Sequence, residues 1–156
     1  MKFEIREATT DDADVIAGYN AAMARETESK ELDPEVIGPG VRNVLDDRTR
    51  GRYWVAESDG RVVGQVMVTY EWSDWRNGTI WWIQSVYVRP QWRRKGVFSA
   101  LYSHVESQAE VTPQVIGLRL YVEENNRRAQ RTYEALGMVN PNYLVMETML
   151  DTDNQD

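Results

Sequence analysis

Three consecutive cations and a glycine, Arg93-Arg94-Lys95-Gly96, stand between an apolar, strand-like segment and a helix-like segment. A helix start leaves four backbone N–H groups without partners and carries about half a positive charge. Gly96 can take backbone angles that curl the chain's amides around an anion, and the cations add charge at the same point. The pattern predicts a phosphate-binding loop. A strand–loop–helix connection with merely solvated basic side chains would have the same composition.

Two motifs give this loop a more specific interpretation. Arg93-x-x-Gly96-x-Phe98 resembles the Q/R-x-x-G-x-G/A coenzyme loop of the GNAT superfamily, the acyl-CoA-dependent N-acyltransferases. A second motif further along the chain resembles that superfamily's other signature: Asn126-x-x-Ala129-x-x-x-Tyr133-x-x-Leu136-Gly137-Met138. Phe98 departs from the pattern, because the family usually has glycine or alanine there.

Composition narrows the class of protein. Apolar residues make up 42% of the 156 residues and charged residues 28%, as in an ordinary globular domain. We expect one domain over residues 1–150 and a polar tail over 151–156. Neither a signal peptide nor a membrane helix is expected, so the predicted location is cytoplasmic.

The charged and metal-binding residue types exclude several functions. The net charge of −7 argues against a nucleic-acid partner, whose phosphate backbone needs a basic face. The chain has no cysteine, which removes disulfides and thiolate nucleophiles, and it has one histidine, His104. We therefore expect no metal site.

The order of elements predicts an α/β fold with a mixed central sheet flanked by helices. We expect Gly38-Pro39-Gly40 to interrupt the second helical region. The expected elements are a strand at 2–8, a helix ending near 25, helical segments from 34, strands at 52–57, 61–72 and 79–88, a helix at 97–110, a strand at 116–122, a helix at 127–136 and a last strand at 143–150. The GNAT resemblance implies the same order, with middle strands that splay apart.

The resemblance assigns coenzyme contacts to two backbone regions. The loop would hold the pyrophosphate of acetyl-CoA, and the splayed strand would offer its backbone to the pantetheine arm and the acyl group. Asn126 would bond the coenzyme arm, cap a helix, or do both. The residues carried over are Val86, Tyr87 and Val88 on the strand and Arg93, Arg94, Lys95, Gly96, Val97, Phe98 and Ser99 in the loop.

Proton transfer needs an acid and a base. A phenol is protonated at neutral pH, so Tyr133 is the candidate acid for the departing thiolate; the competing interpretation is a core tyrosine packed on Leu136. Some family members have a glutamate that acts as the general base on the strand that here runs from Thr79 to Val88. In this sequence that strand contains no Asp or Glu. Glu71 is the nearest alternative, acting through water, or the amine arrives already deprotonated.

Aromatic residues are dense around the third and fourth expected strands. Some must be core, and others could line an acceptor pocket, since indole faces attract ammonium groups. Trp82, with Gln84 and Trp72, is our candidate, because strand alternation predicts that Trp82 points the same way as Val86 and Val88. An exposed patch for homodimerisation is the alternative.

Together these features predict an N-acetyltransferase that moves an acetyl group from acetyl-CoA to a small-molecule or peptide amine in a ternary complex. The alternative is a non-catalytic acyl-CoA-binding or regulatory module on the same fold. Phe98 and the missing strand carboxylate favour that alternative.

Overall fold

A mixed sheet of five strands organises the N-terminal part of the computed structural model, which describes residues 2–150. The strands lie in the order β1-β2-β3-β4-β5, antiparallel up to β4, and β5 pairs parallel to β4. Their bounds are Glu4–Glu7 (β1), Arg52–Ser58 (β2), Arg61–Ser73 (β3), Gly78–Val88 (β4) and Val115–Leu120 (β5). The predicted mixed sheet flanked by helices is confirmed.

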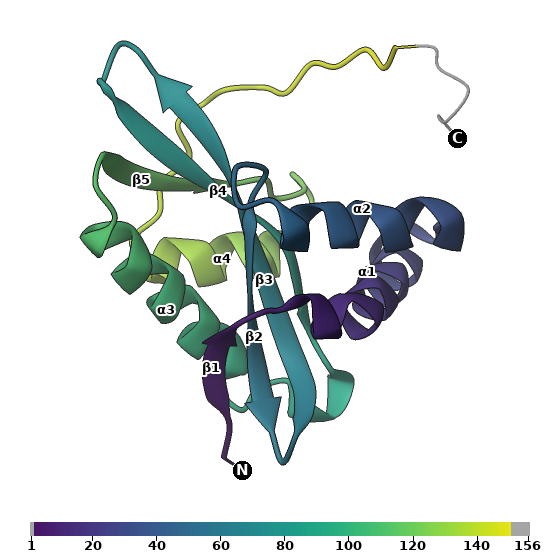
Figure 1. Cartoon of the computed structure of the whole chain (residues 1–156). Helices are drawn as coiled ribbons and strands as arrows, with labels where there is room; N and C mark the ends of the chain where they lie inside the picture. Colours follow the sequence, from purple (N-terminus) through teal and green to yellow (C-terminus); the bar gives the residue numbers. More distant parts are fainter. Residues whose placement is uncertain (1, 151–156) are drawn as a thin grey trace. The chain divides into compact units, whose positions relative to one another are not determined.

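Helices cover both faces of this sheet (Figure 1). On one face lie α1 (Ala13–Glu28) and α2 (Pro34–Asp46), preceded by the short 3-10 helix η1 (Thr10–Asp12). Tyr53 and Val55 of β2 belong to the apolar core on that side, together with Ile16 and Val41. The other face carries α3 (Val97–Val111), which follows the 3-10 helix η2 (Pro90–Trp92).

The helix α2 corrects one expectation, because it runs through Gly38-Pro39-Gly40 without a break. Pro39 removes one backbone donor from the helix, and it is solvent-exposed, so its ring meets no packed neighbour. Val41 is buried, and Ile37 and Val44 pack against the same core. Burial of this apolar face outweighs the local helix-breaking tendency.

The hairpin between β2 and β3 forms as predicted. Its two-residue turn consists of Asp59 (φ 50°) and Gly60 (φ 75°), the left-handed conformation that matches the twist of paired strands. At the other end of β3, Asn77 (φ 51°) likewise turns the chain into β4.

Gly64 on β3 allows an unusually close approach of α3. A Cβ atom at this position would lie 2.9 Å from Val97 Cγ1 and 3.4 Å from Leu101 Cδ1. Val97 and Leu101 are both buried in the first turns of the helix. The start of α3 is thus seated directly on the β3 backbone.

The chain divides into two compact units, one ending at Tyr121 and the other beginning at Val122. The second unit contains α4 (Arg127–Ala135), which Asn126 caps by accepting a hydrogen bond from the Ala129 amide at 3.0 Å. Gly137 (φ 95°) ends the helix. The single-domain interpretation stays a prediction, and the polar tail at 151–156 lies outside the described residues.

The predicted last strand at 143–150 is wrong. This segment forms no strand, and its large side chains are exposed, among them Leu144 (88%) and Met146 (91%). Apolar composition favours an extended chain, but a strand also needs a neighbour that completes its hydrogen-bond ladder. The segment has no such pairing within the described part of the chain.

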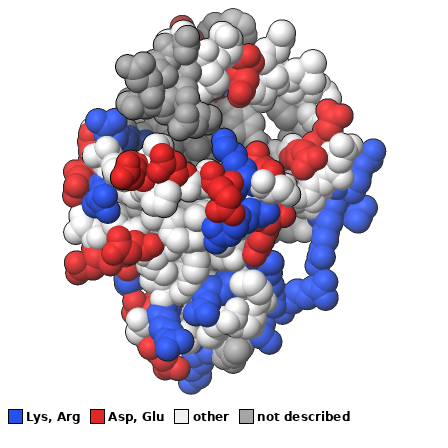
Figure 2. Space-filling model, turned by 90° about the vertical axis from the view of Figure 1, so that its right-hand side faces the viewer, with Lys and Arg blue, Asp and Glu red and all other residues white. Residues whose placement is uncertain are grey.

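Acidic and basic side chains are interspersed on the face shown in Figure 2. Among residues 2–150, no helix combines the length and apolar character that crossing a membrane would need. No group of three or more His, Asp or Glu side chains in the same range could hold a metal ion.

Candidate active site

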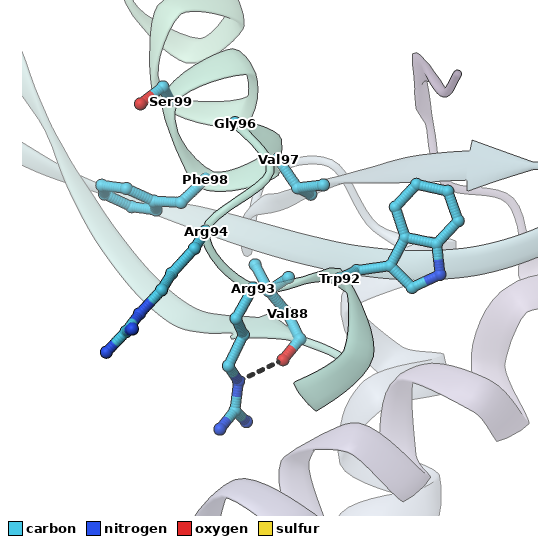
Figure 3. Close-up of a pocket in the computed structure, with 8 residues that line it drawn as sticks. All are labelled: Val88, Trp92, Arg93, Arg94, Gly96, Val97, Phe98 and Ser99. Atoms are coloured by element: carbon cyan, nitrogen blue, oxygen red, sulfur yellow. Dashed lines mark hydrogen bonds between the residues drawn. The ribbon is translucent and has the colours of Figure 1, made fainter. Parts of the chain in front are cut away.

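A half-open pocket of about 180 Å³ lies at the loop between β4 and α3. Arg94 (φ 62°) and Gly96 (φ 83°) both take left-handed backbone angles, and Gly96 is the N-cap of α3. Two such residues close together bend the chain so that its amides face inward. The pocket is lined by Val88, Trp92, Arg93, Arg94, Gly96, Val97, Phe98 and Ser99 (Figure 3).

The amides at the start of α3 are available to a ligand. Within residues 2–150, the N–H groups of Arg94, Lys95, Gly96, Val97 and Ser99 donate to no backbone carbonyl, and no side chain caps the helix. The first bond of the helix ladder runs from the Ala100 amide to the Gly96 carbonyl, at 3.0 Å. Uncapped donors together with the helix dipole favour an anion at this point.

The side chain of Arg93 is used differently from the prediction. Its Nε donates to the Val88 carbonyl at 2.8 Å, and its Nη2 pairs with Glu26 at 2.8 Å. Figure 3 shows the guanidinium pointing away from the first turn of α3. Of the three cations, only Arg94 and Lys95 form no ion pair with any described residue. Arg93 therefore stabilises the loop, and Arg94 and Lys95 supply its uncompensated positive charge.

Glu26, at the end of α1, links the helix to the loop. Its second carboxylate oxygen accepts a hydrogen bond from Tyr87 of β4 at 3.1 Å, and the guanidinium of Arg93 lies 5.3 Å from the Tyr87 ring centre. The hydrogen bond from Arg93 is the main cause that lowers the pKa of Glu26, and the hydrogen bond from Tyr87 lowers it further. The sequence does not reveal this contact, because Glu26 and Arg93 lie 67 residues apart and meet only in the fold.

Strand β4 leaves its neighbour β5 halfway along. The last pair in their ladder is Ile83 with Leu120, so the backbone from Gln84 to Val88 has no partner in β5. This gap is the splay that the family resemblance implied. The Arg89 amide donates to Val63 of β3, and successive strand residues alternate in direction, so the polar backbone groups of Val88 point to the open edge.

A β-bulge lies at the point where β4 splays. Gln65 of β3 pairs with Tyr87 and Met67 pairs with Gln84, so Ser85 and Val86 together oppose one residue of β3. Ser85 has a left-handed conformation (φ 52°) that is unfavourable for a residue with a side chain. Alternation along the sequence does not reveal this bulge.

The bulge corrects the expected direction of the acceptor-pocket residues. Trp82 and Gln84 pair with Thr69 and Met67 on the α1 side of the sheet, whereas Val88 pairs with Gly64, which faces α3. The extra residue in β4 reverses the alternation, so Trp82 and Val88 lie on opposite faces.

Trp82 belongs to a polar and aromatic cluster with Glu71. Its indole nitrogen donates to Glu71 at 2.7 Å, and its ring lies 4.5 Å from that of Tyr121. Arg119 of β5 pairs with the same carboxylate at 3.0 Å. The hydrogen bond from Trp82 and the Arg119 ion pair lower the pKa of Glu71, which makes it a weaker base. Gln84 bonds to Thr69 nearby.

Trp72 lies further out on β3 and is 53% exposed. Trp75, in the turn that follows, is 92% exposed. These two indoles do not line the loop pocket, and the homodimer that an exposed aromatic patch would suit stays a prediction.

Asn126 and Tyr133 belong to the second unit. Asn126 is a helix cap, as one of its two interpretations expected. Burial raises the pKa of the Tyr133 phenol, so the group is protonated at neutral pH. Its role toward a coenzyme stays a prediction.

Comparison with known proteins identifies the family. The model of the acetyltransferase (GNAT) family matches residues 17–138. The chain belongs to this family. A structure described as a possible acetyltransferase from Clostridium difficile 630 is 45% identical, with a TM-score of 0.90, and covers 97% of this chain and 100% of that one.

More distant structures share the GNAT fold alone. A ribosomal-protein-alanine N-acetyltransferase from Brucella melitensis biovar Abortus 2308 is 19% identical (TM-score 0.76; 96% of this chain and 100% of that chain). A transcriptional regulator from Bacillus halodurans C-125 is 20% identical (TM-score 0.79; 96% and 100%). No curated protein matches the sequence.

Proposed function

We propose that this GNAT protein is an N-acetyltransferase that moves the acetyl group of acetyl-CoA to an amine. The observation that carries the proposal is the set of unpaired amides at the start of α3, beside Arg94 and Lys95. They would bind the coenzyme pyrophosphate through backbone donors and charge. The loop residues from Arg93 to Ser99 would enclose it.

The splayed half of β4 would position the rest of the coenzyme. Its open edge begins after Ile83, and the polar backbone groups of Val88 point to that edge. The Val88 carbonyl is already bonded by Arg93, which leaves the amide for the pantetheine arm. The alternation that turns Val88 outward turns the Tyr87 backbone toward β3, so the Val86 N–H is the group that would meet the thioester and stabilise its carbonyl oxygen as it gains negative charge.

The reaction is a direct transfer between two bound substrates. The amine nitrogen attacks the thioester carbon, a C–N bond forms, the C–S bond breaks, and the coenzyme leaves as a thiolate. We assign the proton for that thiolate to Tyr133, whose raised pKa keeps it a phenol. Asn126 would contribute to the same coenzyme arm in addition to capping α4.

The amine must lose a proton before or during attack. Glu71 is a poor base because its carboxylate is neutralised by Arg119 and bonded by Trp82. We therefore propose that the amine reaches the site as the neutral amine. The proton that its nitrogen loses as the C–N bond forms would return through water to the Tyr133 phenolate left after protonation of the thiolate. The Glu71 cluster would form one wall of the acceptor site together with Gln84. Trp72 would contact only an acceptor that extends along β3.

Two measurements test the proposal. Calorimetry with acetyl-CoA should detect binding, and release of free thiol should follow when small amines and peptides with free amino groups are added. Absence of binding at millimolar acetyl-CoA would refute it.

The second candidate is a regulatory module that binds acyl-CoA without turnover. Phe98, which lines the pocket where the family usually has a small residue, favours it. Binding of acetyl-CoA with no thiol release across the whole amine panel would select this alternative. In that case the protein would acetylate neither a small-molecule amine nor a peptide amine.

A further inference from the structure

A buried polar cluster lies beneath the β4 bulge on the side of α1. Gln65 is fully buried (0% exposed), and Asn20 of α1 and Tyr53 of β2 are 5% and 3% exposed. The Gln65 side-chain nitrogen donates to Asn20 Oδ1 at 3.1 Å and to the Ser85 carbonyl at 3.1 Å. The Asn20 amide donates in turn to the Tyr53 hydroxyl at 3.1 Å.

This cluster is costly to fold. Gln65 Oε1 is buried and has no hydrogen-bond partner within the described residues. An unsatisfied buried acceptor costs about 1–3 kcal/mol. Ser85 adds the cost of a left-handed conformation. An apolar residue at position 65 would avoid the first cost, so the amide has a purpose beyond packing.

That purpose follows from the geometry of one peptide group. The Ser85 carbonyl and the Val86 N–H belong to the same planar, trans peptide, so they point in opposite directions. When Gln65 fixes the carbonyl toward the buried cluster, it also fixes the N–H away from it. Val86 lies in the bulge at the start of the open edge, where the thioester is expected.

We propose that Gln65 is a positioning residue for acetyl transfer. It holds the Ser85–Val86 peptide in the orientation that aims the Val86 N–H at the thioester carbonyl. The inference rests on the proposed function, because it concerns the oxyanion donor of that reaction. Gln65 itself touches neither substrate.

The test compares Gln65→Leu with Asn20→Leu in the full chain. Both variants disturb the same buried cluster, but only the first removes the bond to Ser85. We expect Gln65→Leu to lower kcat roughly 10- to 100-fold, because misdirecting an oxyanion donor should cost no more than removing it. The Kd for coenzyme A should stay within about twofold of the native value. Asn20→Leu should lower the melting temperature by a similar amount and kcat by less than about threefold.

A third variant gives a readout that packing alone would not move. In Gln65→Glu, the neutral acid can donate to the Ser85 carbonyl and the carboxylate cannot. We expect the ratio of its kcat to that of the native protein to rise as the pH falls. A ratio that is flat with pH, or equal losses of kcat in the two leucine variants, would overturn the inference.

The outcome separates this inference from the proposed function. If the native protein binds acetyl-CoA and releases thiol while Gln65→Leu keeps full kcat, the inference alone fails. If the native protein binds acetyl-CoA without turnover, the readout is the NMR shift of the Val86 amide between bound coenzyme A and bound acetyl-CoA. That shift should disappear in Gln65→Leu, and its persistence would refute the role. If no coenzyme binds, both proposals fall.

Discussion

Replacement of Gly96 by alanine tests the coenzyme loop most directly. Gly96 caps α3 with φ 83° and ψ 6°, and a Cβ added there would meet no protein atom within 4 Å. The substitution therefore causes no clash. It acts only through backbone strain and through the methyl group placed at the wall of the pocket.

The two effects have separate magnitudes. A left-handed conformation costs a residue with a side chain about 1–2 kcal/mol, which lowers the melting temperature of a chain of this size by roughly 2–8 °C. A hydrogen bond to a charged group contributes about 1.5–3 kcal/mol. If the methyl group or a shift of the loop removes one bond to the pyrophosphate, the Kd for coenzyme A rises roughly 10- to 100-fold.

Gly60→Ala is the matched control. Gly60 has a similar angle (φ 75°) in the turn between β2 and β3, and a Cβ there also meets open space. We expect equal losses of stability in thermal melts of the two variants, with weaker coenzyme binding by calorimetry only in Gly96→Ala. Equal affinities in the two variants would show that the loop does not bind the coenzyme.

Three further predictions concern charged and phenolic groups. Asp12→Asn should lower stability at pH 7 by about 1–2 kcal/mol in urea unfolding, because Asp12 bonds Arg6 at 2.8 and 2.9 Å. That ion pair holds the pKa of Asp12 below its usual value, so its contribution to stability is present above pH about 4 and is lost as the pH falls through the folded pKa; a stability difference between variant and native protein that stays constant as the pH falls from 7 into the acid range would contradict this. Glu71→Gln should change kcat less than about threefold and leave the acid limb of the rate–pH profile in place, since Arg119 already neutralises the carboxylate; loss of the limb would restore Glu71 as the base. Tyr133→Phe should lower kcat about 100-fold in a thiol-release assay with little change in coenzyme affinity, and unchanged kcat would remove the phenol from the mechanism.

Local chemistry made the loop and the first hairpin predictable. Asp59-Gly60 is a strong signal for a tight turn, and Gly96 stands directly before a helix-like segment. The same reasoning failed for α2, because burial of Val41 and its neighbours outweighs the effect of Pro39. It failed for residues 143–150 because strand formation depends on a partner that is not encoded locally.

The sequence predicted the part of the site that depends on residue type alone, namely the glycine and cations of the loop. The bulge at Ser85 changes which side chains share a face, and no glycine marks it in the sequence. Arg93 was assigned to phosphate, but Glu26 lies 67 residues away in the chain and reaches it only in the fold. Gln65 carried a weak signal, as one amide among valines in a strand, and its role becomes visible only through its contact with Ser85.

The close seating of α3 on Gly64 has a consequence for how this protein can vary. Val97 packs directly against the Gly64 backbone, so interior packing fixes the positions of the backbone N–H groups at the start of α3. These N–H groups therefore cannot move independently of one another. A methyl group at position 64 would displace the whole helix end by tenths of an ångström, moving every donor together. Substitutions in the interior of the first unit should thus change ligand affinity. Substitutions at the exposed Arg94 and Lys95 should change only the charge of the loop and leave the N–H groups in place.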